Sequence, residues 1–407
     1  MDRTDVAVIG GGASGLFCAL ALKRLNPRLR VTVLEKQDRV GRKLLATGNG
    51  RCNLTNLRAT AEEAVAFYPG GGGFAKAALA AFSPADVCAF FREIGLPVRR
   101  DEAGRFYPMS NQAASVLDVL RFSLAEAGAE IRCGFQVRQI CPAFVLSGDG
   151  GEISSRIAVL AVGGPAGSAL GAGSDATRFA GQLRIPFVPF QPALCALRTD
   201  PALVRALKGQ RVRGAVSLYE GEACLARQEG EILFGEGSVS GIAAMQLARF
   251  ALEPLRRGAK LHVSVCAADP QTSELALRRA RLPRRALEDF LTGLTGKRVG
   301  MALMRQAGID RLSRTAETLT DAELRGLEAA LSDWRFPVTG VMGFADAQIS
   351  AGGLRLSHFD PATMESKSIK GLYAIGEALD VDGMSGGFNL QWAWASAMSC
   401  ARAAARA

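Results

Sequence analysis

The sequence is poor in the side chains from which hydrolytic and metal sites are usually built. It contains two histidines, His262 and His358, and their positions provide neither a catalytic triad nor a set of metal ligands. The nine cysteines include no C-x-x-C pair, so neither a metal finger nor a dithiol couple is indicated. An odd, scattered set of cysteines in a long chain is typical of reduced thiols in a cytoplasmic protein. No metal site is therefore predicted.

The sequence also lacks a long apolar run. The first apolar stretch is broken by Lys23 and Arg24, too early for a membrane span, and the charged N-terminus does not resemble a signal peptide. We therefore expect a soluble cytoplasmic protein with no membrane segment. The net charge of +10 is carried by arginines spread along the chain. Solvated helix faces explain this distribution better than a nucleic-acid surface does, although the nucleic-acid alternative stays open.

A strand, a glycine-rich turn and a helix open the chain with the letters DVAVIGGGASGLFCALALKRL. Gly10, Gly12 and Gly15 have the G-x-G-x-x-G spacing of dinucleotide-binding folds. The first glycine allows a tight turn, the second lets a pyrophosphate approach the backbone, and the third lets helix and strand pack closely. Glu35 ends the next strand, where its carboxylate can accept hydrogen bonds from ribose hydroxyls. The same charge would repel a 2′-phosphate, which favours FAD or NAD over NADP; a purely structural glycine turn is the alternative.

The pattern along the chain predicts an α/β fold with an insertion. Residues 1–188 show the strand and helix pattern of the first part of a Rossmann-type domain. Residues 189–270 alternate as an antiparallel, β-rich and barrel-like inserted domain, and residues 271–335 are a small helical part of the insertion. Residues 336–407 return to glycine-rich strands and form the second part of the nucleotide-binding domain. Neither an internal repeat nor a low-complexity linker interrupts this order.

Two long segments give the chain a resemblance to a known family. These are VGRKLLATGNGRCNLTN, directly after Glu35 and its neighbours, and GLYAIGEALDVDGMSGGFNLQWAWASA near the C-terminus. They resemble the HI0933-like, or BaiN-like, flavoproteins, which are often described as NAD(P)/FAD-dependent oxidoreductases. The resemblance covers nearly the whole chain, including GRFYPMSNQAASVL. It implies an enzyme with a Rossmann-type FAD-binding domain, an inserted β-rich domain, a small helical part, and FAD as the cofactor.

The first segment has the residue types expected beside a flavin. Gly48 and Gly50 permit a close backbone approach, Arg42 and Lys43 can meet the pyrophosphate or the ribityl chain, and Asn53 offers a hydrogen-bond donor. Cys52 has two interpretations, a redox thiol near the flavin or a small buried side chain. The buried side chain is favoured because no second cysteine lies nearby in sequence.

The second segment is expected to contact the ribityl chain and the flavin ring of the cofactor. Gly376 ends a strand, and Glu377 or Asp380 can accept hydrogen bonds from ribityl hydroxyls. The helix that begins at Gly387 and Phe388 would direct its N-terminal dipole at the reduced flavin. The complete set of residues expected to contact the cofactor is Gly10, Gly12, Ala13, Ser14, Gly15, Glu35, Lys36, Arg42, Lys43, Thr47, Gly48, Asn49, Gly50, Cys52, Asn53, Val137, Gly163, Gly376, Glu377, Asp380, Gly387, Phe388, Asn389 and Leu390.

The predicted function is hydride transfer between flavin N5 and a small-molecule substrate that the sequence does not identify. No residue stands out as a catalytic acid or base. A second Rossmann domain is missing from the pattern, so NAD(P)H would have to visit the flavin transiently as the reductant. Two alternatives remain, a flavin-dependent RNA-modifying enzyme and a redox-silent FAD-binding regulatory protein. The sequence does not indicate an oligomeric state.

Overall fold

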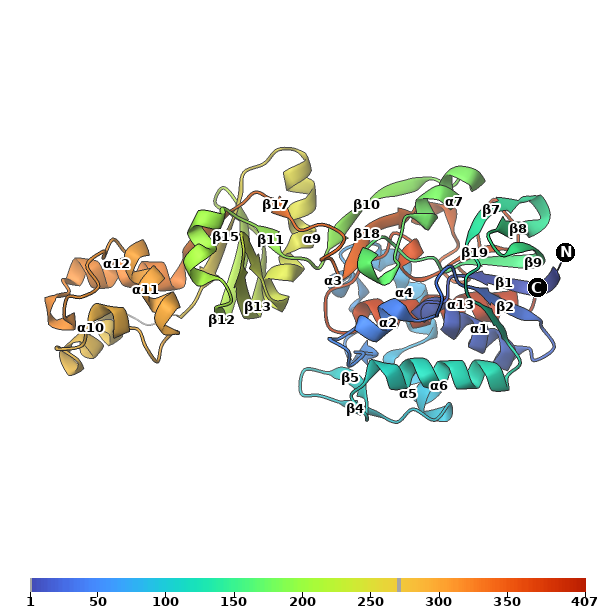
Figure 1. The fold of residues 1–407 in the computed structure, drawn as a ribbon, viewed down its shortest axis with the longest axis horizontal. Helices are drawn as coiled ribbons and strands as arrows, with labels where there is room; N and C mark the ends of the chain where they lie inside the picture. The colour runs from blue at the N-terminus through green and yellow to red at the C-terminus, as the bar shows by residue number, and fades with distance from the viewer. Residues whose placement is uncertain (1, 269–271) are drawn as a thin grey trace. The chain divides into compact units, whose positions relative to one another are not determined.

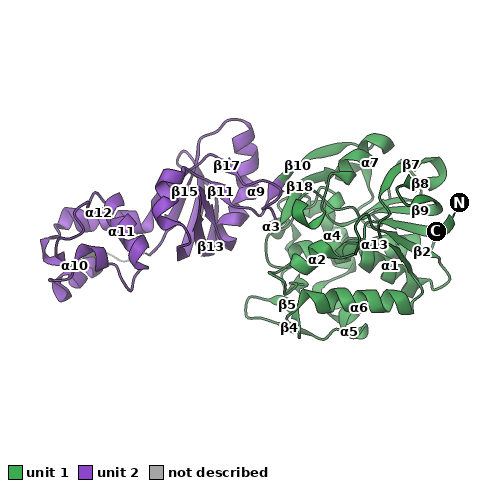
Figure 2. Cartoon of the chain, viewed as in Figure 1, with its two compact units in different colours: residues 1–191, 348–407 green, residues 192–347 purple. Residues whose placement is uncertain are grey.

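The computed structural model describes residues 2–268 and 272–407. The chain divides into unit 1, which contains Met1–Gln191 and Gln348–Ala407, and unit 2, which contains Pro192–Ala347 (Figure 2). The second break lies after the boundary expected at 335/336, because strands on both sides of residue 339 pair within the sheet of unit 2. The boundary expected at 270/271 lies outside the described residues.

A largely parallel sheet forms the centre of unit 1 (Figure 1). Its strand order is β6-β2-β1-β9-β8-β7, with β19 also paired to β9. Strands β6, β2, β1, β9 and β19 run parallel, whereas β7 and β8 are antiparallel neighbours at one edge. All of β2 is buried, as is usual for a parallel strand covered on both faces. The strands are β1 (Asp2–Ile9), β2 (Val31–Leu34), β6 (Glu130–Arg132), β7 (Val137–Cys141), β8 (Val145–Gly148), β9 (Gly151–Leu160) and β19 (Leu372–Ala374).

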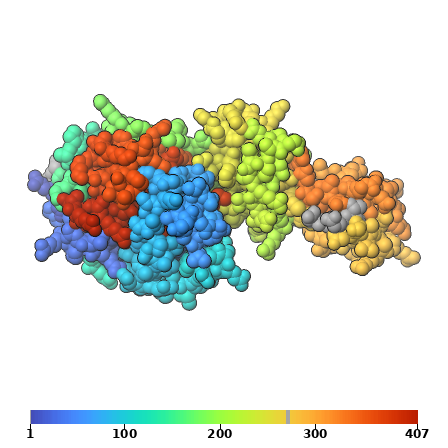
Figure 3. Space-filling model, turned by 180° about the vertical axis from the view of Figure 1, so that it is seen from behind, coloured from blue at the N-terminus to red at the C-terminus, as the bar shows by residue number. Residues whose placement is uncertain are grey.

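The C-terminal segment completes the sheet that the N-terminal segment begins. β19 pairs with the last three residues of β9, from Leu372 opposite Ala158 to Ala374 opposite Leu160. Because β1 takes the other edge of β9, β8 and β19 share one edge of this long strand. The space-filling view shows C-terminal atoms in red directly against blue atoms of the first hundred residues (Figure 3). Residues far apart in sequence are therefore neighbours in unit 1.

Two buried helices lie together in unit 1. α1 and α13 are in contact, and most of their residues are buried, as expected for helices that are apolar all round. Phe17 lies 4.4 to 6.1 Å, between ring centroids, from Phe82, Phe90, Phe91 and Trp394, so aromatic packing joins the two helices to α5. The helices of unit 1 are α1 (Ala13–Leu25), α2 (Arg42–Ala46), α3 (Ala64–Phe67), α4 (Gly72–Ala81), α5 (Pro84–Glu93), α6 (Ala113–Glu126), α7 (Asp175–Leu183) and α13 (Phe388–Ala404).

Two small sheets complete this part of the chain. One has the order β3-β5-β4, and the other pairs β10 with β18. Their strands are β3 (Thr55–Asn56), β4 (Val98–Arg100), β5 (Arg105–Pro108), β10 (Phe187–Ala193) and β18 (Ile349–Leu354).

Unit 2 contains an antiparallel sheet with the order β16-β15-β12-β13-β14-β11-β17. One helix, α9 (Ile242–Arg256), packs against β12 and β13. The antiparallel sheet agrees with the β-rich insertion of the expected fold class. The strands are β11 (Leu197–Arg198), β12 (Arg211–Glu220), β13 (Ala223–Gly235), β14 (Ser238–Ser240), β15 (Leu261–Cys266), β16 (Trp334–Val338) and β17 (Gly340–Val341), and a short helix, α8 (Pro201–Val204), follows β11.

The helical part of unit 2 consists of α10 (Thr272–Arg281), α11 (Lys297–Gln306) and α12 (Asp321–Ser332). α12 begins with a capping box. Thr320 Oγ1 accepts the Glu323 N–H at 3.1 Å, and Glu323 Oε2 accepts the Thr320 N–H at 2.8 Å.

Among the described residues, no single helix has both the length and the apolar character needed to cross a membrane. Helices α4 and α5 meet the requirement of length and composition only as a pair, with a bend of 47° between them.

Replacing Glu323 should destabilise the helical part of unit 2. A hydrogen bond from Arg314 lowers the pKa of Glu323 to about 2, from an ordinary value of 4.5. The interaction of the Glu323 carboxylate with Arg314 therefore stabilises the folded protein fully above pH 4.5, and this stabilisation is lost as the pH falls towards 2. We expect Glu323→Gln to cost about 1 kcal/mol at neutral pH and almost nothing near pH 2, measured by urea unfolding.

The matched control is Glu328→Gln in the same helix, because the Glu328 carboxylate joins none of the ion pairs found among the described residues. An equal loss of stability in the two variants at neutral pH would contradict a stabilising role of the Glu323 carboxylate.

Candidate cofactor-binding site

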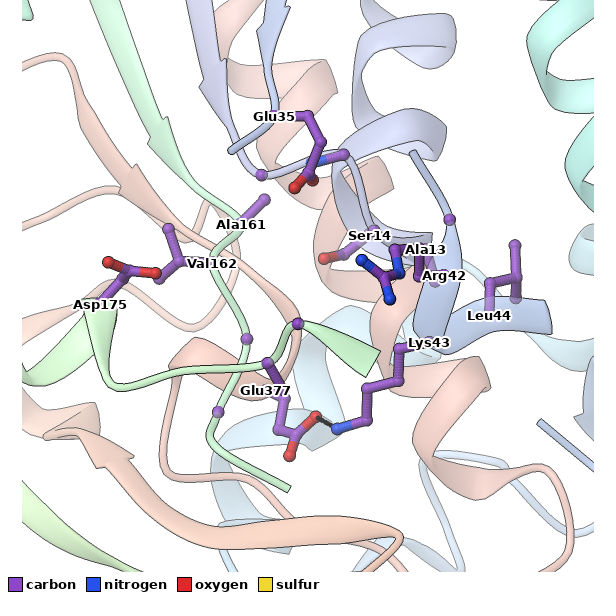
Figure 4. A pocket seen from close by; sticks show the side chains of 18 of the residues that line it. Ala13, Ser14, Glu35, Arg42, Lys43, Leu44, Ala161, Val162, Asp175 and Glu377 are labelled. Atoms are coloured by element: carbon purple, nitrogen blue, oxygen red, sulfur yellow. Dashed lines mark hydrogen bonds and ion pairs between the residues drawn. The ribbon is translucent and has the colours of Figure 1, made fainter. Parts of the chain in front are cut away.

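A cavity of about 240 Å³ lies in unit 1 at the carboxyl ends of the parallel strands. Ile9 ends β1, Leu34 ends β2, and Ala161 follows β9, and all three line it. This is the edge at which ligands bind in open α/β sheets. Figure 4 shows Glu35, Asp175, Arg42 and the Lys43–Glu377 pair arranged around this space.

Glycine occurs at the three motif positions for different structural reasons. Gly10 has φ +112°, and a β-carbon there would lie 2.4 Å from the Ala161 carbonyl oxygen. A β-carbon at Gly15 would lie 2.0 Å from the Gly10 carbonyl oxygen, so Gly15 lets α1 pack on the turn. Gly12 has φ −84°, which any residue can adopt, and a β-carbon there would meet no protein atom within 4 Å. The protein therefore needs glycine at 10 and 15, whereas Gly12 leaves the backbone open to the cavity.

The Glu35 carboxylate is held in a fixed orientation beside the glycine turn. Its Oε2 accepts the Gly11 N–H at 2.8 Å and its Oε1 accepts the Gln37 N–H at 2.8 Å. Each carboxylate oxygen can accept a further hydrogen bond. Glu35 can therefore receive the two hydroxyls of a ribose without losing its own supports.

An ion pair across the cavity joins the two segments of unit 1. Lys43 Nζ lies 2.7 Å from Glu377 Oε2, and Glu377 Oε1 accepts the Ser350 N–H at 2.7 Å (Figure 4). Arg42, next to Lys43, donates to Gln37 Oε1 at 2.8 Å. These groups place hydrogen-bond donors and acceptors along the wall between the glycine turn and the start of α13.

The structure brings many of the predicted residues together around this cavity. Those that line it are Gly10, Gly12, Ala13, Ser14, Glu35, Lys36, Arg42, Lys43, Thr47, Val137, Gly163, Glu377, Asn389 and Leu390. The other predicted residues lie outside the lining, and they are Gly15, Gly48, Asn49, Gly50, Cys52, Asn53, Gly376, Asp380, Gly387 and Phe388.

The loop from Thr47 to Asn53 explains several of these exceptions. The Gly50 and Cys52 N–H groups both donate to the Thr47 carbonyl oxygen, at 3.1 and 3.0 Å, and Gly48 to Gly50 all have positive φ. The glycines therefore serve a tight turn of the loop itself, and within residues 47–53 only Thr47 lines the cavity.

Close packing explains why glycine occurs at two of the predicted C-terminal positions that lie outside the lining, Gly376 and Gly387. A β-carbon at Gly387 would lie 2.7 Å from the Thr55 carbonyl oxygen, so this glycine lets the start of α13 approach β3. A β-carbon at Gly376 would lie 2.7 Å from Ser14 Oγ. Asn389 lines the cavity, but its amide oxygen accepts the Gly383 N–H and its amide nitrogen donates to the Gly383 carbonyl oxygen, both at 2.8 Å. The Asn389 side chain therefore shapes the loop before α13.

Several lining residues had not been predicted. Gly11 and Gln37 follow predicted positions directly, so the motif itself could have identified them. Asp175, Phe135 and Phe179 lie in other elements and had no local signal, because only the tertiary fold brings them to Glu35. The segment between β9 and α7 contributes Gly163, which was predicted, and Gly171, which was not, and both line the cavity.

The fold and this cavity define a dinucleotide-binding protein of the Rossmann type. The HI0933-like protein Rossmann domain matches residues 4–403, and the chain belongs to this family. The predicted family, the fold class and the assignment as a FAD-dependent oxidoreductase are confirmed at this level.

Relatives with a named activity match over nearly the whole chain. The 3-dehydro-bile acid delta(4,6)-reductase of Clostridium scindens is 34% identical, and the match covers 98% of each chain. The ribosomal RNA dihydrouridine synthase of Haemophilus influenzae is 28% identical, again over 98% of each chain. Among solved structures, 3-ketosteroid delta1-dehydrogenase from Sterolibacterium denitrificans has a TM-score of 0.54 at 14% identity, with full coverage of both chains. This last similarity concerns the fold alone.

Substitution of Gly12 tests the cavity as a nucleotide site. In Gly12→Ala the new methyl group would project into open space, so the protein should fold, with a loss of at most about 1 kcal/mol because alanine is a poor N-cap. We expect the affinity for FAD, measured by titration of the apoprotein, to fall by about tenfold or more, since the methyl group would occupy the space of a pyrophosphate. The matched control is Gly73→Ala, which also adds a methyl group in open space but at a residue outside the cavity lining. Equal FAD affinities in the two variants would contradict the placement.

Labelling tests the two interpretations of Cys52. Burial raises the pKa of the Cys52 thiol to about 12, and a hydrogen bond with Thr47 opposes this only in part, so the thiol is protonated at neutral pH. The thiolate is the reactive form. We expect iodoacetamide to modify exposed Cys224 and to leave Cys52 unmodified in the folded protein, as measured by peptide mass spectrometry. Rapid modification of Cys52 before unfolding would instead support a redox thiol.

Proposed function

We propose that the chain reduces a carbon–carbon double bond conjugated with a carbonyl group, using FAD, and that its substrate is a small alicyclic enone. Two observations support this proposal. The cavity has the features of a FAD site, and the names of both relatives describe saturation of such a double bond, in a 3-dehydro bile acid and in uridine. The relative with the higher identity, at 34%, acts on the small molecule.

One observation carries the cofactor assignment. Gly12 is the motif glycine that neither backbone conformation nor protein packing requires, and it opens onto the same cavity as Glu35. A pyrophosphate can approach the backbone at Gly12, where helix α1 begins and its free N–H groups and dipole favour an anion. The adjacent Glu35 carboxylate then accepts the ribose hydroxyls of the adenosine.

The remaining lining residues suit the rest of FAD. We assign the Lys43–Glu377 pair to the ribityl chain, since it offers an ammonium and a carboxylate on the wall between the glycine turn and α13. The first turn of α13 contributes Asn389 and Leu390 to the cavity and would face the ring system. When bound, the reduced flavin supplies a hydride for the β-carbon of the enone, and a proton for the α-carbon completes the reduction.

NAD(P)H is proposed as a transient reductant. The sheet of unit 2 is antiparallel throughout its described strands, so it does not provide a second nucleotide-binding βαβ unit. A nicotinamide would therefore have to reach the flavin from solution and leave before the enone binds.

A second candidate is reduction of uridine in ribosomal RNA. The helical part of unit 2 has exposed arginines that form no ion pair with any described residue, and they are Arg281, Arg284, Arg285, Arg298, Arg305, Arg311 and Arg325. Such a cationic surface suits a polyanion. Binding of RNA through it should weaken steeply with salt and should weaken further when these arginines are replaced by glutamine.

Anaerobic turnover separates the candidates. The purified protein is reduced with NADH or NADPH, and reoxidation of its flavin absorbance is followed after addition of a 3-oxo-Δ4,6 bile acid or a uridine-containing ribosomal RNA fragment. We expect reoxidation by the enone with formation of the saturated ketone, identified by mass spectrometry.

The other outcomes are equally specific. Reoxidation by the RNA fragment alone would favour the second candidate, and a bound flavin that neither nicotinamide reduces would favour the redox-silent regulatory protein. A folded preparation that does not bind FAD would refute all three.

A further inference from the structure

A glycine-rich strap crosses the ribose end of the cavity. Residues 163–174, called the strap from here on, connect β9 to α7, and Gly163, Gly164, Leu170 and Gly171 within it line the cavity. The strap passes close to the residues that follow Glu35. A β-carbon at Gly171 would lie 2.7 Å from the Gln37 side chain, and one at Gly173 would lie 2.9 Å from Lys36 Nζ.

An ion pair fastens the far end of the strap. Lys36 Nζ lies 2.7 Å from Oδ2 of Asp175, the residue that follows the strap and begins α7. Both side chains line the cavity and are mostly buried, with 24% of the Lys36 side chain and 14% of the Asp175 side chain exposed. The pair therefore connects the end of β2, beside the ribose-binding Glu35, to the start of α7.

A second cation fixes the Asp175 carboxylate from the other side. Arg178 Nη2 lies 2.6 Å from Asp175 Oδ1 and donates to the Val137 carbonyl oxygen at 2.8 Å. Burial by itself would raise the pKa of Asp175, but hydrogen bonds from Lys36 and Arg178 outweigh it and lower the pKa. The carboxylate is therefore charged at neutral pH and is tied to β2 and β7 at once.

This arrangement places Asp175 where it could affect how a bound nucleotide is retained. Glu35, Lys36, Val137 and the strap surround the same end of the cavity, and the glycines of the strap give it little rigidity of its own. We propose that the Lys36–Asp175 ion pair holds the strap closed over the adenosine end of FAD, which makes Asp175 a positioning residue for cofactor retention. This inference rests on the proposed FAD site.

The rate of FAD release tests the strap directly. The holoprotein is diluted into an excess of an apoflavodoxin trap, and the dissociation rate is measured for wild type, Asp175→Asn and Asp175→Glu at low and high salt. We expect Asp175→Asn to release FAD about tenfold faster than wild type, the change expected for loss of a partly buried ion pair. Asp175→Glu, which keeps the charge, should restore slow release, and added salt should accelerate release from wild type more than from Asp175→Asn.

A double-mutant cycle separates the ion pair from independent contacts of each residue. Lys36→Gln should accelerate release by a similar factor, and the variant with both substitutions should release FAD no faster than either single variant. The control is Glu236→Gln, which removes the exposed Lys208–Glu236 ion pair in unit 2 and should leave the release rate unchanged.

Two results would overturn the proposal. Release from Asp175→Asn at the wild-type rate would show that the strap does not depend on this pair, and additive effects in the double variant would show that the two residues act separately. In both cases binding of FAD by the wild-type protein would leave the proposed function standing. Failure of the wild-type protein to bind FAD would overturn both proposals.

Discussion

The pairing of β19 with β9 is the constraint on which the rest of unit 1 depends. These three residue pairs bring a segment from beyond residue 347 onto a sheet whose other central strands come from the first 160 residues. Once β19 is in place, Gly376 lies against Ser14 and α13 packs against α1. The backbone hydrogen bonds between β19 and β9 therefore fix the N-terminal and C-terminal segments of unit 1 relative to each other. Glu377, Asn389 and Leu390, which the second segment contributes to the cavity lining, follow β19 in the chain and depend on this pairing for their place.

Polar groups on the cavity wall are arranged in pairs that join different elements. Lys43 and Glu377 connect the two segments of unit 1, and Lys36 and Asp175 connect β2 with α7. Partly buried charges are costly unless they are paired, so each pair favours one relative position of its elements. The groups that would contact a nucleotide are therefore also groups that hold the walls of the cavity together.

The success of the sequence predictions depended on how local each role is. Gly10 and Gly15 have the structural roles that were predicted for them, because the turn and the helix packing are set within a single βαβ unit. Glu35 directly follows β2 as predicted, and its role as the acceptor of ribose hydroxyls stays a prediction. The loop around Gly48 and Gly50 was expected to surround the flavin because of its composition. In the structure these glycines adopt the positive φ values that the turn of the loop requires, and they do not line the cavity. Composition alone could not distinguish a glycine that leaves space for a ligand from one that allows a tight turn in a loop.

The sequence by itself determined the strand–turn–helix opening, the acid at the end of β2, the capping box of α12 and the insertion of a β-rich segment, because periodicity and turn chemistry act over short distances. The tertiary structure alone decided which residues share the cavity. Asp175 meets Lys36 across 139 positions of the chain, and Lys43 meets Glu377 across 334. Contacts of this kind follow from the order in which strands join a sheet, and no local pattern records that order.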